Sequence, residues 1–380
     1  MLRLLRWIAL PLWAIQLFTG AKSFGSNPIL GSVTLNRRGL HVLRARLAHR
    51  LAARRRAQLG RRLSGADREA FARDGFIARP DFLPPADFEA LRREIQAFRG
   101  RAAEFKEGDA ITRRIALTPA NLKRLPSCRA LLQRRDWRAL VRYVSSFDVD
   151  PIVSIQTIFS EVDGGPPDPQ LRPHIDTFHP TMKAWPFLDD VTDAGGPLAY
   201  WPGSHRRTPR REAWERRRSI EAADPQTRRK GGAFRVTSAE MRRMGYGEPE
   251  RFAVAANTLV VADTFGVHCR TRSLQPSARI EIWASSRHNP FRPWAGGHWL
   301  AGMIGARAVT LNWRLTALRR RLGLPAPDLR LVEDVGAQDP PAPWGAEARA
   351  QVSRAFPLGD GRSPTLCSGQ AATKPKLGET

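Results

Sequence analysis

The sequence feature that most constrains the fold is the stretch from His174 to Arg279. It begins with His174-Ile175-Asp176 and ends with His268 and, eleven residues later, Arg279. If the first segment is extended, His174 and Asp176 point the same way, because side chains alternate along a strand. Two histidines and one carboxylate are the ligand set of a facial triad, which holds a redox-active iron and leaves one face open. The pattern therefore predicts that another strand brings His268 beside the first pair.

Arg279 follows the last of these histidines at the start of a predicted strand. Its guanidinium is a planar fork that binds carboxylates through two hydrogen bonds, which suits the distal carboxylate of a keto-acid cosubstrate. The alternative is an ordinary ion pair with Glu281, which lies two residues on and on the same strand face. Cys269 is expected to be a buried core thiol. His179 and His205 are not assigned as metal ligands.

Short β-rich runs separated by Gly and Pro turns predict a sandwich or barrel. A helix is expected from Ser64, as an N-cap, through Ala72, and Pro84-Pro85-Ala86-Asp87 is expected to start a second helix that runs to about Phe98. Between them, Asp74-Gly75-Phe76-Ile77 is typical of a turn that enters a short strand. The further predicted strands are 152–159, 185–188, 198–201, 258–262 and 279–283. No Gly-rich phosphate loop is present in the sequence.

The order and spacing of these motifs resemble the phytanoyl-CoA dioxygenase family of iron(II)- and 2-oxoglutarate-dependent oxygenases, from about Phe71 to Ser286. The motifs that carry the resemblance are Asp74-Gly75-Phe76, Phe82-Leu83, His174-Ile175-Asp176, the run Trp185-Pro186-Phe187-Leu188-Asp189-Asp190-Val191, Gly195-Gly196-Pro197-Leu198, Pro202-Gly203-Ser204-His205, His268 and Arg279.

The resemblance implies a mainly β fold with flanking helices, a double-stranded β-helix of the jelly-roll or cupin-like barrel type. It implies that His174, Asp176 and His268 form the catalytic iron(II) site. Arg279 would bind the C5 carboxylate of the cosubstrate 2-oxoglutarate, Trp185 would line its pocket, and O2 would be consumed. Related halogenases lack the carboxylate ligand, which makes room for chloride, so Asp176 favours hydroxylation.

The charge of the chain bears on its partners rather than on its fold. A formal net charge of +26 favours acidic partners, such as anionic lipids, nucleic acid, or substrates that carry phosphate or carboxylate. The segment 206–230 is rich in arginine and is either a solvated excursion or a basic rim over the pocket. Three widely spaced cysteines provide no disulfide framework, which favours a reducing compartment.

The N-terminal segment raises the question of a membrane. The apolar run from Trp7 to Phe18 would span roughly 18 Å as a helix, which is too short to cross a hydrocarbon core of about 30 Å. It resembles a secretory signal, but ten arginines and no acid in 36–62 favour retention on the cytoplasmic side. Leucines at 40, 43, 47 and 51, with arginines between them, predict a basic amphipathic helix on an anionic membrane surface.

These inferences combine into one prediction of organisation. Residues 1–62 would form a membrane-associating segment. Residues 63–310 would form the dioxygenase domain, with a basic insertion at 206–252. Residues 311–380 would be a C-terminal extension, with a disordered tail at 361–380.

The predicted function is hydroxylation of a C–H bond in a lipid or another anionic small molecule. The predicted place is the cytoplasm, peripheral on the inner face of the membrane. Two alternatives stay open at this point: an oxygenase directed at nucleic acid, although no specific nucleic acid is expected as a partner, and a non-catalytic binding module on the same barrel.

Overall fold

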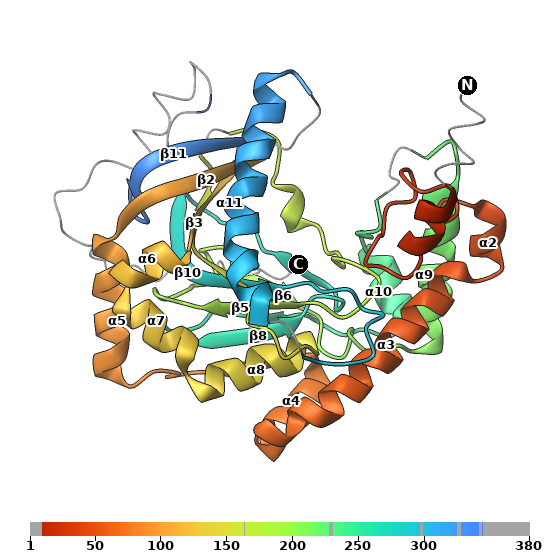
Figure 1. Cartoon of the computed structure of the whole chain (residues 1–380), viewed down its shortest axis with the longest axis horizontal. Helices are drawn as coiled ribbons and strands as arrows, with labels where there is room; N and C mark the ends of the chain where they lie inside the picture. Colours follow the sequence, from red (N-terminus) through yellow and green to blue (C-terminus); the bar gives the residue numbers. More distant parts are fainter. Residues whose placement is uncertain are drawn as a thin grey trace, which may run out of the picture.

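A computed structural model describes residues 10–162, 164–227, 231–296, 299–324, 328–341 and 344. Its centre is an eight-stranded antiparallel sheet in the order β1-β8-β5-β10-β4-β3-β2-β11 (Figure 1). The strands of this sheet are β1 (Phe76–Arg79), β2 (Arg99–Glu107), β3 (Ala110–Ala116), β4 (Ile152–Ser160), β5 (Met182–Pro186), β8 (Leu259–Asp263), β10 (Ser277–Ser286) and β11 (Leu329–Gly336). A second sheet, in the order β7-β6-β9, contains β6 (Leu198–Tyr200), β7 (Glu250–Arg251) and β9 (His268–Arg270).

The two sheets face each other across a cavity. Leu198 and His268 of the small sheet line it together with Trp185, Arg279 and other residues of the large sheet. This two-sheet arrangement confirms the predicted mainly β, jelly-roll fold with flanking helices. The sheets are not joined into a closed barrel by continuous strand pairing among the described residues.

Helices cover the large sheet on the face away from the cavity. These helices are α4 (Gly65–Asp74), α5 (Pro85–Ala97), α6 (Pro119–Arg124), α7 (Pro126–Gln133) and α8 (Arg135–Ser145). Their apolar residues join those of the strands in the largest core cluster, in which Leu91, Leu131 and Trp137 pack with Ile155 and Ile282. Every second residue of β4 and β10 therefore faces the core, and the residues between them are left for the cavity.

The N-terminal and basic segments pack together beside the small sheet. They comprise α2 (Val33–Arg37), α3 (Leu40–Leu59), α9 (Pro209–Ala223) and α10 (Ser238–Met244), which Figure 1 shows grouped on one side of the molecule. The basic insertion is not simply solvated, because Arg211 and Glu215 form an ion pair of 3.2 Å with both side chains buried. The remaining long helix, α11 (Trp299–Arg321), crosses the sheet near β2, β3 and β11. No described helix is both long and apolar enough to cross a membrane.

Gly75 explains why two of the sequence motifs occur together. It ends α4 with φ +88°, a left-handed conformation that favours glycine. A Cβ at this position would lie 2.4 Å from Nδ1 of His205 and 2.5 Å from Oη of Tyr200. The Asp74-Gly75-Phe76 turn is therefore packed directly on the Pro202-Gly203-Ser204-His205 turn, and only glycine fits between them.

The predicted strands are confirmed at β4, β5, β6, β8 and β10, with boundaries that move by a few residues. The short strand after Gly75 is confirmed as β1. The Ser64 hydroxyl accepts a hydrogen bond from the Asp67 amide and caps α4, which runs two residues beyond the predicted end at Ala72. The predicted tail at 361–380 lies outside the described residues.

The predicted helix at 40–51 is part of α3. A basic amphipathic helix would bury its leucines and expose its arginines, but α3 does this only in part. Arg44 and Arg55 are buried on its inner face, whereas Leu43 and Leu47 are exposed. The Arg55 guanidinium donates to Ser146 and lies 4.0 Å from the centre of the Phe147 ring. Arg44 and Arg55 thus attach α3 to the domain, and Leu43 and Leu47 are left on its outer side, whereas Leu51 is buried.

Candidate metal centre

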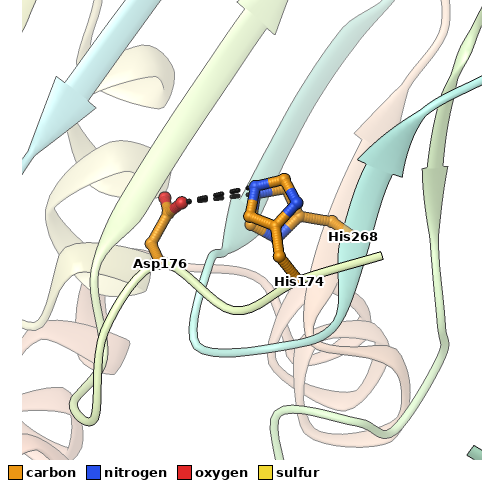
Figure 2. A group of neighbouring side chains, drawn as sticks. All are labelled: His174, Asp176 and His268. Atoms are coloured by element: carbon orange, nitrogen blue, oxygen red, sulfur yellow. Dashed lines mark ion pairs between the residues drawn. The ribbon is translucent and has the colours of Figure 1, made fainter. Parts of the chain in front are cut away.

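His174, Asp176 and His268 form a cluster of side chains that could hold a metal ion (Figure 2). Oδ1 of Asp176 lies 3.7 Å from Nε2 of His174 and 3.8 Å from Nε2 of His268. One donor atom from each residue lies within 4.8 Å of the others. Among the described residues this is the one cluster of three such side chains.

Backbone pairing brings the two histidines together. The His174 amide donates to the His268 carbonyl over 3.0 Å, and the reverse bond has the same length. The Asp176 amide donates to the carbonyl of Thr264. His174 and Asp176 therefore lie beside the start of β9 although they belong to no regular strand of their own, and their carboxylate and imidazoles converge.

Hydrogen bonds also select the tautomer of each histidine. Nδ1 of His174 lies 2.9 Å from the carbonyl of Arg172, and Nδ1 of His268 lies 3.0 Å from the carbonyl of Gly266. A carbonyl can only accept, so each Nδ1 carries the proton and each Nε2 keeps its lone pair. Both lone pairs belong to the atoms that face Asp176.

The charge state of the cluster suits a cation. Burial alone raises the pKa of the Asp176 carboxyl, but Lys183, His268 and His174 together outweigh burial and hold this pKa below its ordinary value. Burial lowers the pKa of His268 to about 4 and that of His174 well below 6.5. Near neutral pH the cluster therefore offers two neutral imidazoles and one carboxylate. This donor set fits iron(II) of the facial-triad type.

Lys183 of β5 is the cation that balances Asp176 in this structure. Its ammonium lies 2.7 Å from Oδ2 of Asp176 and 3.5 Å from Nε2 of His268. Sequence reasoning missed Lys183 because the predicted strand began at Trp185. Extension of that strand by one alternation would have placed Lys183 on the same face as Trp185.

The other end of the cavity contains Arg279. Its Nε lies 3.1 Å from Oε2 of Glu281, and its Nη1 donates to the carbonyl of Gly196 over 2.7 Å. The ion pair that the sequence left open as an alternative therefore forms. The structure shows no hydrogen bond at Nη2 of Arg279 among the described residues, and the side chain lines a cavity of about 200 Å³.

A hydrogen-bonded chain supports this end of the cavity. Gln156 donates to Oε1 of Glu281 over 2.5 Å and accepts from Nε of Arg114 over 2.7 Å. The Arg114 guanidinium lies 3.9 Å from the centre of the Trp283 ring. Trp185, which the resemblance placed at the cosubstrate pocket, lines the same cavity and is mostly buried.

The remaining residues singled out in the sequence contribute no side chain to the triad. Cys269 is free and buried, as expected, and burial raises its pKa to about 12. His205 packs against Phe71, with ring centres 5.3 Å apart. His179 contacts Phe178 and its own neighbour, Pro180.

The N-terminal segment reaches the metal centre, which no sequence signal indicated. Nζ of Lys22 donates to the carbonyl of Asp176 over 2.5 Å. Arg44 of α3 holds the segment by donating to the carbonyls of Leu17, Thr19 and Ala21 over 2.8 to 3.0 Å. Burial, followed by the nearby charge of Arg287, lowers the pKa of Lys22 to about 8. Arg44 thus holds the segment in a position from which Lys22 contacts the backbone of the triad.

Comparison with known proteins gives one match by sequence. Residues 71–243 match the model of the family described as Phytanoyl-CoA dioxygenase (PhyH), which confirms the predicted resemblance. This range contains His174 and Asp176, whereas His268 and Arg279 lie beyond it and join the site through folding. No curated protein matches the chain.

Similar solved structures include the epimerase SnoN in complex with Fe3+, alpha ketoglutarate and nogalamycin RO. It is 18% identical, with a TM-score of 0.36, over 60% of this chain and 83% of that chain. HygX from Streptomyces hygroscopicus with nickel and 2-oxoglutarate bound is 17% identical, with a TM-score of 0.37, over 59% and 86%. The carbocyclase SnoK from nogalamycin biosynthesis is 16% identical, with a TM-score of 0.36, over 64% and 90%.

Proposed function

We propose that this chain, whose residues 71–243 match the model of the phytanoyl-CoA dioxygenase family of iron(II)- and 2-oxoglutarate-dependent oxygenases, hydroxylates an anionic, lipid-like small molecule. The observation that carries the proposal is a single cavity that is lined by His174 and His268 and also by Arg279, with Asp176 beside the two histidines.

Different residues of this cavity would bind the metal and the cosubstrate. His174, Asp176 and His268 would hold iron(II) through two imidazole nitrogens and a carboxylate oxygen. Arg279 would pair with the far carboxylate of 2-oxoglutarate, and Trp185 would line the same pocket. Iron(II) with 2-oxoglutarate and O2 supplies the oxidising power to hydroxylate a C–H bond.

Positive charge beside the triad favours an anionic substrate. The ammonium groups of Lys183 and Lys22 contact the side chain and the carbonyl of Asp176, respectively. Arg287 donates to the same carbonyl over 3.4 Å. Of these three cations, only Lys183 contacts the carboxylate of Asp176, which iron would engage. The ammonium of Lys183 would then be available to a phosphate or carboxylate on the substrate.

The outer surface of the N-terminal segment favours a substrate that resides in a membrane. Five apolar side chains from two segments joined by Arg44 are between 43% and 64% exposed: Leu12, Ile15, Phe18, Leu43 and Leu47. Exposed apolar groups beside arginines are typical of a peripheral, anionic membrane surface. We propose that residues 1–62 hold the enzyme there, on the cytoplasmic face.

The test of the reaction is 2-oxoglutarate turnover. Purified protein with iron(II), ascorbate and 2-oxoglutarate should release succinate, and Asp176→Ala should abolish the release. Candidate substrates are then screened by mass spectrometry for the gain of one oxygen, with long-chain carboxylates and lysophospholipids set against their uncharged analogues. Absence of iron-dependent 2-oxoglutarate binding in the wild type would refute the reaction, and a preference for the uncharged analogues would refute the substrate class.

A further inference from the structure

Helix α11 has two apolar faces, of which one is buried and the other is exposed. On the buried face Trp313, Val309 and Ala317 pack with Phe105 of β2 and Leu329 of β11. On the other face Leu311, Leu315 and Leu318 are 57%, 50% and 50% exposed, and Leu322, just past the last helical residue, is 65% exposed. The amide of Leu322 donates to the carbonyl of Leu318, so it continues the last turn.

The four exposed leucines lie in one line, which we call the leucine stripe. At about 100° per residue, positions 311, 315, 318 and 322 fall within about 60° of one another around the helix axis. Positions 309, 313 and 317 fall on the opposite side. The stripe is therefore not the edge of the packed face but a separate surface, roughly 16 Å long at 1.5 Å per residue.

Arginines border the leucine stripe on both sides. By the same rotation, Arg314 and Arg321 lie on one flank and Arg319 on the other, and all three are exposed. Helix α11 contains no Asp or Glu from Trp299 to Arg321. The structure shows no ion pair for these three arginines among the described residues. Uncompensated positive charge on both sides of an apolar line is typical of a helix that lies in a membrane interface, where arginine stems run along the apolar surface and their heads reach lipid phosphates.

The charges favour a lipid surface over a second copy of this chain. A symmetric pair of α11 helices would bring the arginines of both copies together without an acid between them. Nucleic acid would satisfy the arginines but not the leucines. We propose that the leucine stripe docks on an anionic phospholipid surface, with α11 parallel to the membrane plane. This surface is additional to the one proposed for residues 1–62 and does not depend on the oxygenase reaction.

The test uses the full chain and a probe of local environment. In a Cys367→Ser background, an environment-sensitive dye is attached to Leu315→Cys and, as a matched control, to Leu274→Cys, another exposed leucine outside the stripe. Vesicles of phosphatidylcholine with one quarter phosphatidylglycerol should shift the emission of the dye at 315 to the blue and leave the dye at 274 unchanged. Vesicles of phosphatidylcholine alone should produce a much smaller shift at 315.

Two variants separate the parts of the surface. Replacement of Arg314, Arg319 and Arg321 by Gln should weaken binding to the anionic vesicles by about 100-fold, at roughly a tenfold change for every 1.4 kcal/mol and about 1 kcal/mol for each arginine. Leu315→Ser with Leu318→Ser should weaken it by more than about tenfold. Sedimentation with vesicles but no blue shift at 315 would show that another surface binds, and would overturn the proposal. A dimer that the leucine variant dissolves, without vesicle binding, would overturn it in favour of a second copy.

Discussion

The two ends of the cavity each contain a charged side chain with a counter-charge from the protein, but the two counter-charges differ in burial and origin. At the metal end the carboxylate of Asp176 is balanced by Lys183, which comes from a different segment and keeps its side chain 22% exposed. At the arginine end the guanidinium of Arg279 is balanced by Glu281 of the same strand, and the Glu281 side chain is fully buried. Each end therefore holds an internal partner in the place where a ligand charge would act.

The difference between the two partners has a physical consequence. Lys183 has a flexible stem with access to solvent, so its ammonium can leave Asp176 at little cost when a metal arrives. Glu281 cannot leave, because it is buried and bonded to Gln156. If Arg279 binds 2-oxoglutarate, as we propose, it does so while it stays bonded to Glu281, through the guanidinium nitrogen that Glu281 and Gly196 do not use. The Arg279–Glu281 ion pair therefore makes the arginine end rigid. At the metal end, the Lys183 ammonium can be exchanged for a metal ion.

The largest effect is expected from removal of the carboxylate at the metal end. Asp176→Ala removes a ligand and leaves the Lys183 ammonium beside the two imidazoles, so metal affinity and succinate release should fall by more than about 100-fold, the upper range for loss of groups that only support a ligand. Cobalt(II) absorption and succinate release measure the two quantities. His179→Gln, a buried histidine outside the triad, is the control and should retain both.

Loss of the guanidinium at the arginine end should weaken 2-oxoglutarate binding but leave metal affinity nearly unchanged. Arg279→Gln removes one partner of a buried charge pair and should weaken 2-oxoglutarate binding by about 100-fold, from a cost of about 3 kcal/mol, while cobalt(II) affinity changes less than about twofold. Titration of the cobalt(II) form with 2-oxoglutarate measures this. Arg279→Lys, which keeps the charge and loses the fork, should give an intermediate value. Equal losses of metal and 2-oxoglutarate would contradict the separation of the two ends.

Removal of Glu281, the buried partner of Arg279, should change cosubstrate binding and stability in opposite directions. Glu281→Gln deletes the anion that competes with 2-oxoglutarate for Arg279, so the cosubstrate should bind about tenfold more tightly. The melting temperature of the ligand-free protein should fall, because Arg279 is left buried without a counter-charge. Calorimetric titration and thermal unfolding test the two halves. Weaker binding would show that Glu281 positions Arg279 more than it competes.

The smallest effect is expected from the exchangeable partner. Lys183→Met removes the ammonium from Asp176 and should raise cobalt(II) affinity about threefold to fivefold, which matches about 1 kcal/mol for a partly exposed ion pair. Lys183→Arg keeps the positive charge, so it should not raise cobalt(II) affinity. Competition with a metal-binding dye provides the measurement. A fall in affinity in Lys183→Met would mean that Lys183 orients the carboxylate rather than competes for it.

The parts of the site that the sequence could predict are those whose chemistry is fixed by residue type and spacing. His174 and Asp176, two apart, and His268 with Arg279 eleven residues on, are visible without coordinates. Strand β4 was predictable because its residues alternate in a β-rich run. The Arg279–Glu281 pair could be foreseen as an alternative for the same reason, since residues two apart on a strand share a face.

The parts that the sequence could not predict depend on contacts between distant segments. Strand β3 contains two consecutive arginines, Arg113 and Arg114, a pattern that suggests a surface loop. Both are nevertheless paired inside the fold, Arg113 with Glu104 at 2.6 Å and Arg114 with Gln156. Lys22 looks like an ordinary N-terminal lysine until the chain folds back onto Asp176. The exposure of the leucine stripe is invisible in the sequence because α11 is apolar on both sides.

The contact of the N-terminal segment with the metal centre also sets an order of events during synthesis. Lys22 leaves the ribosome early, but its acceptor at Asp176 follows about 150 residues later, and Asn289, which donates to the carbonyl of Phe18, comes later still. At roughly 5–20 residues per second, the segment waits for some tens of seconds without its binding site. This early-made segment is therefore fixed only late in synthesis. During that interval its apolar residues are open to whatever surface or chaperone meets them first.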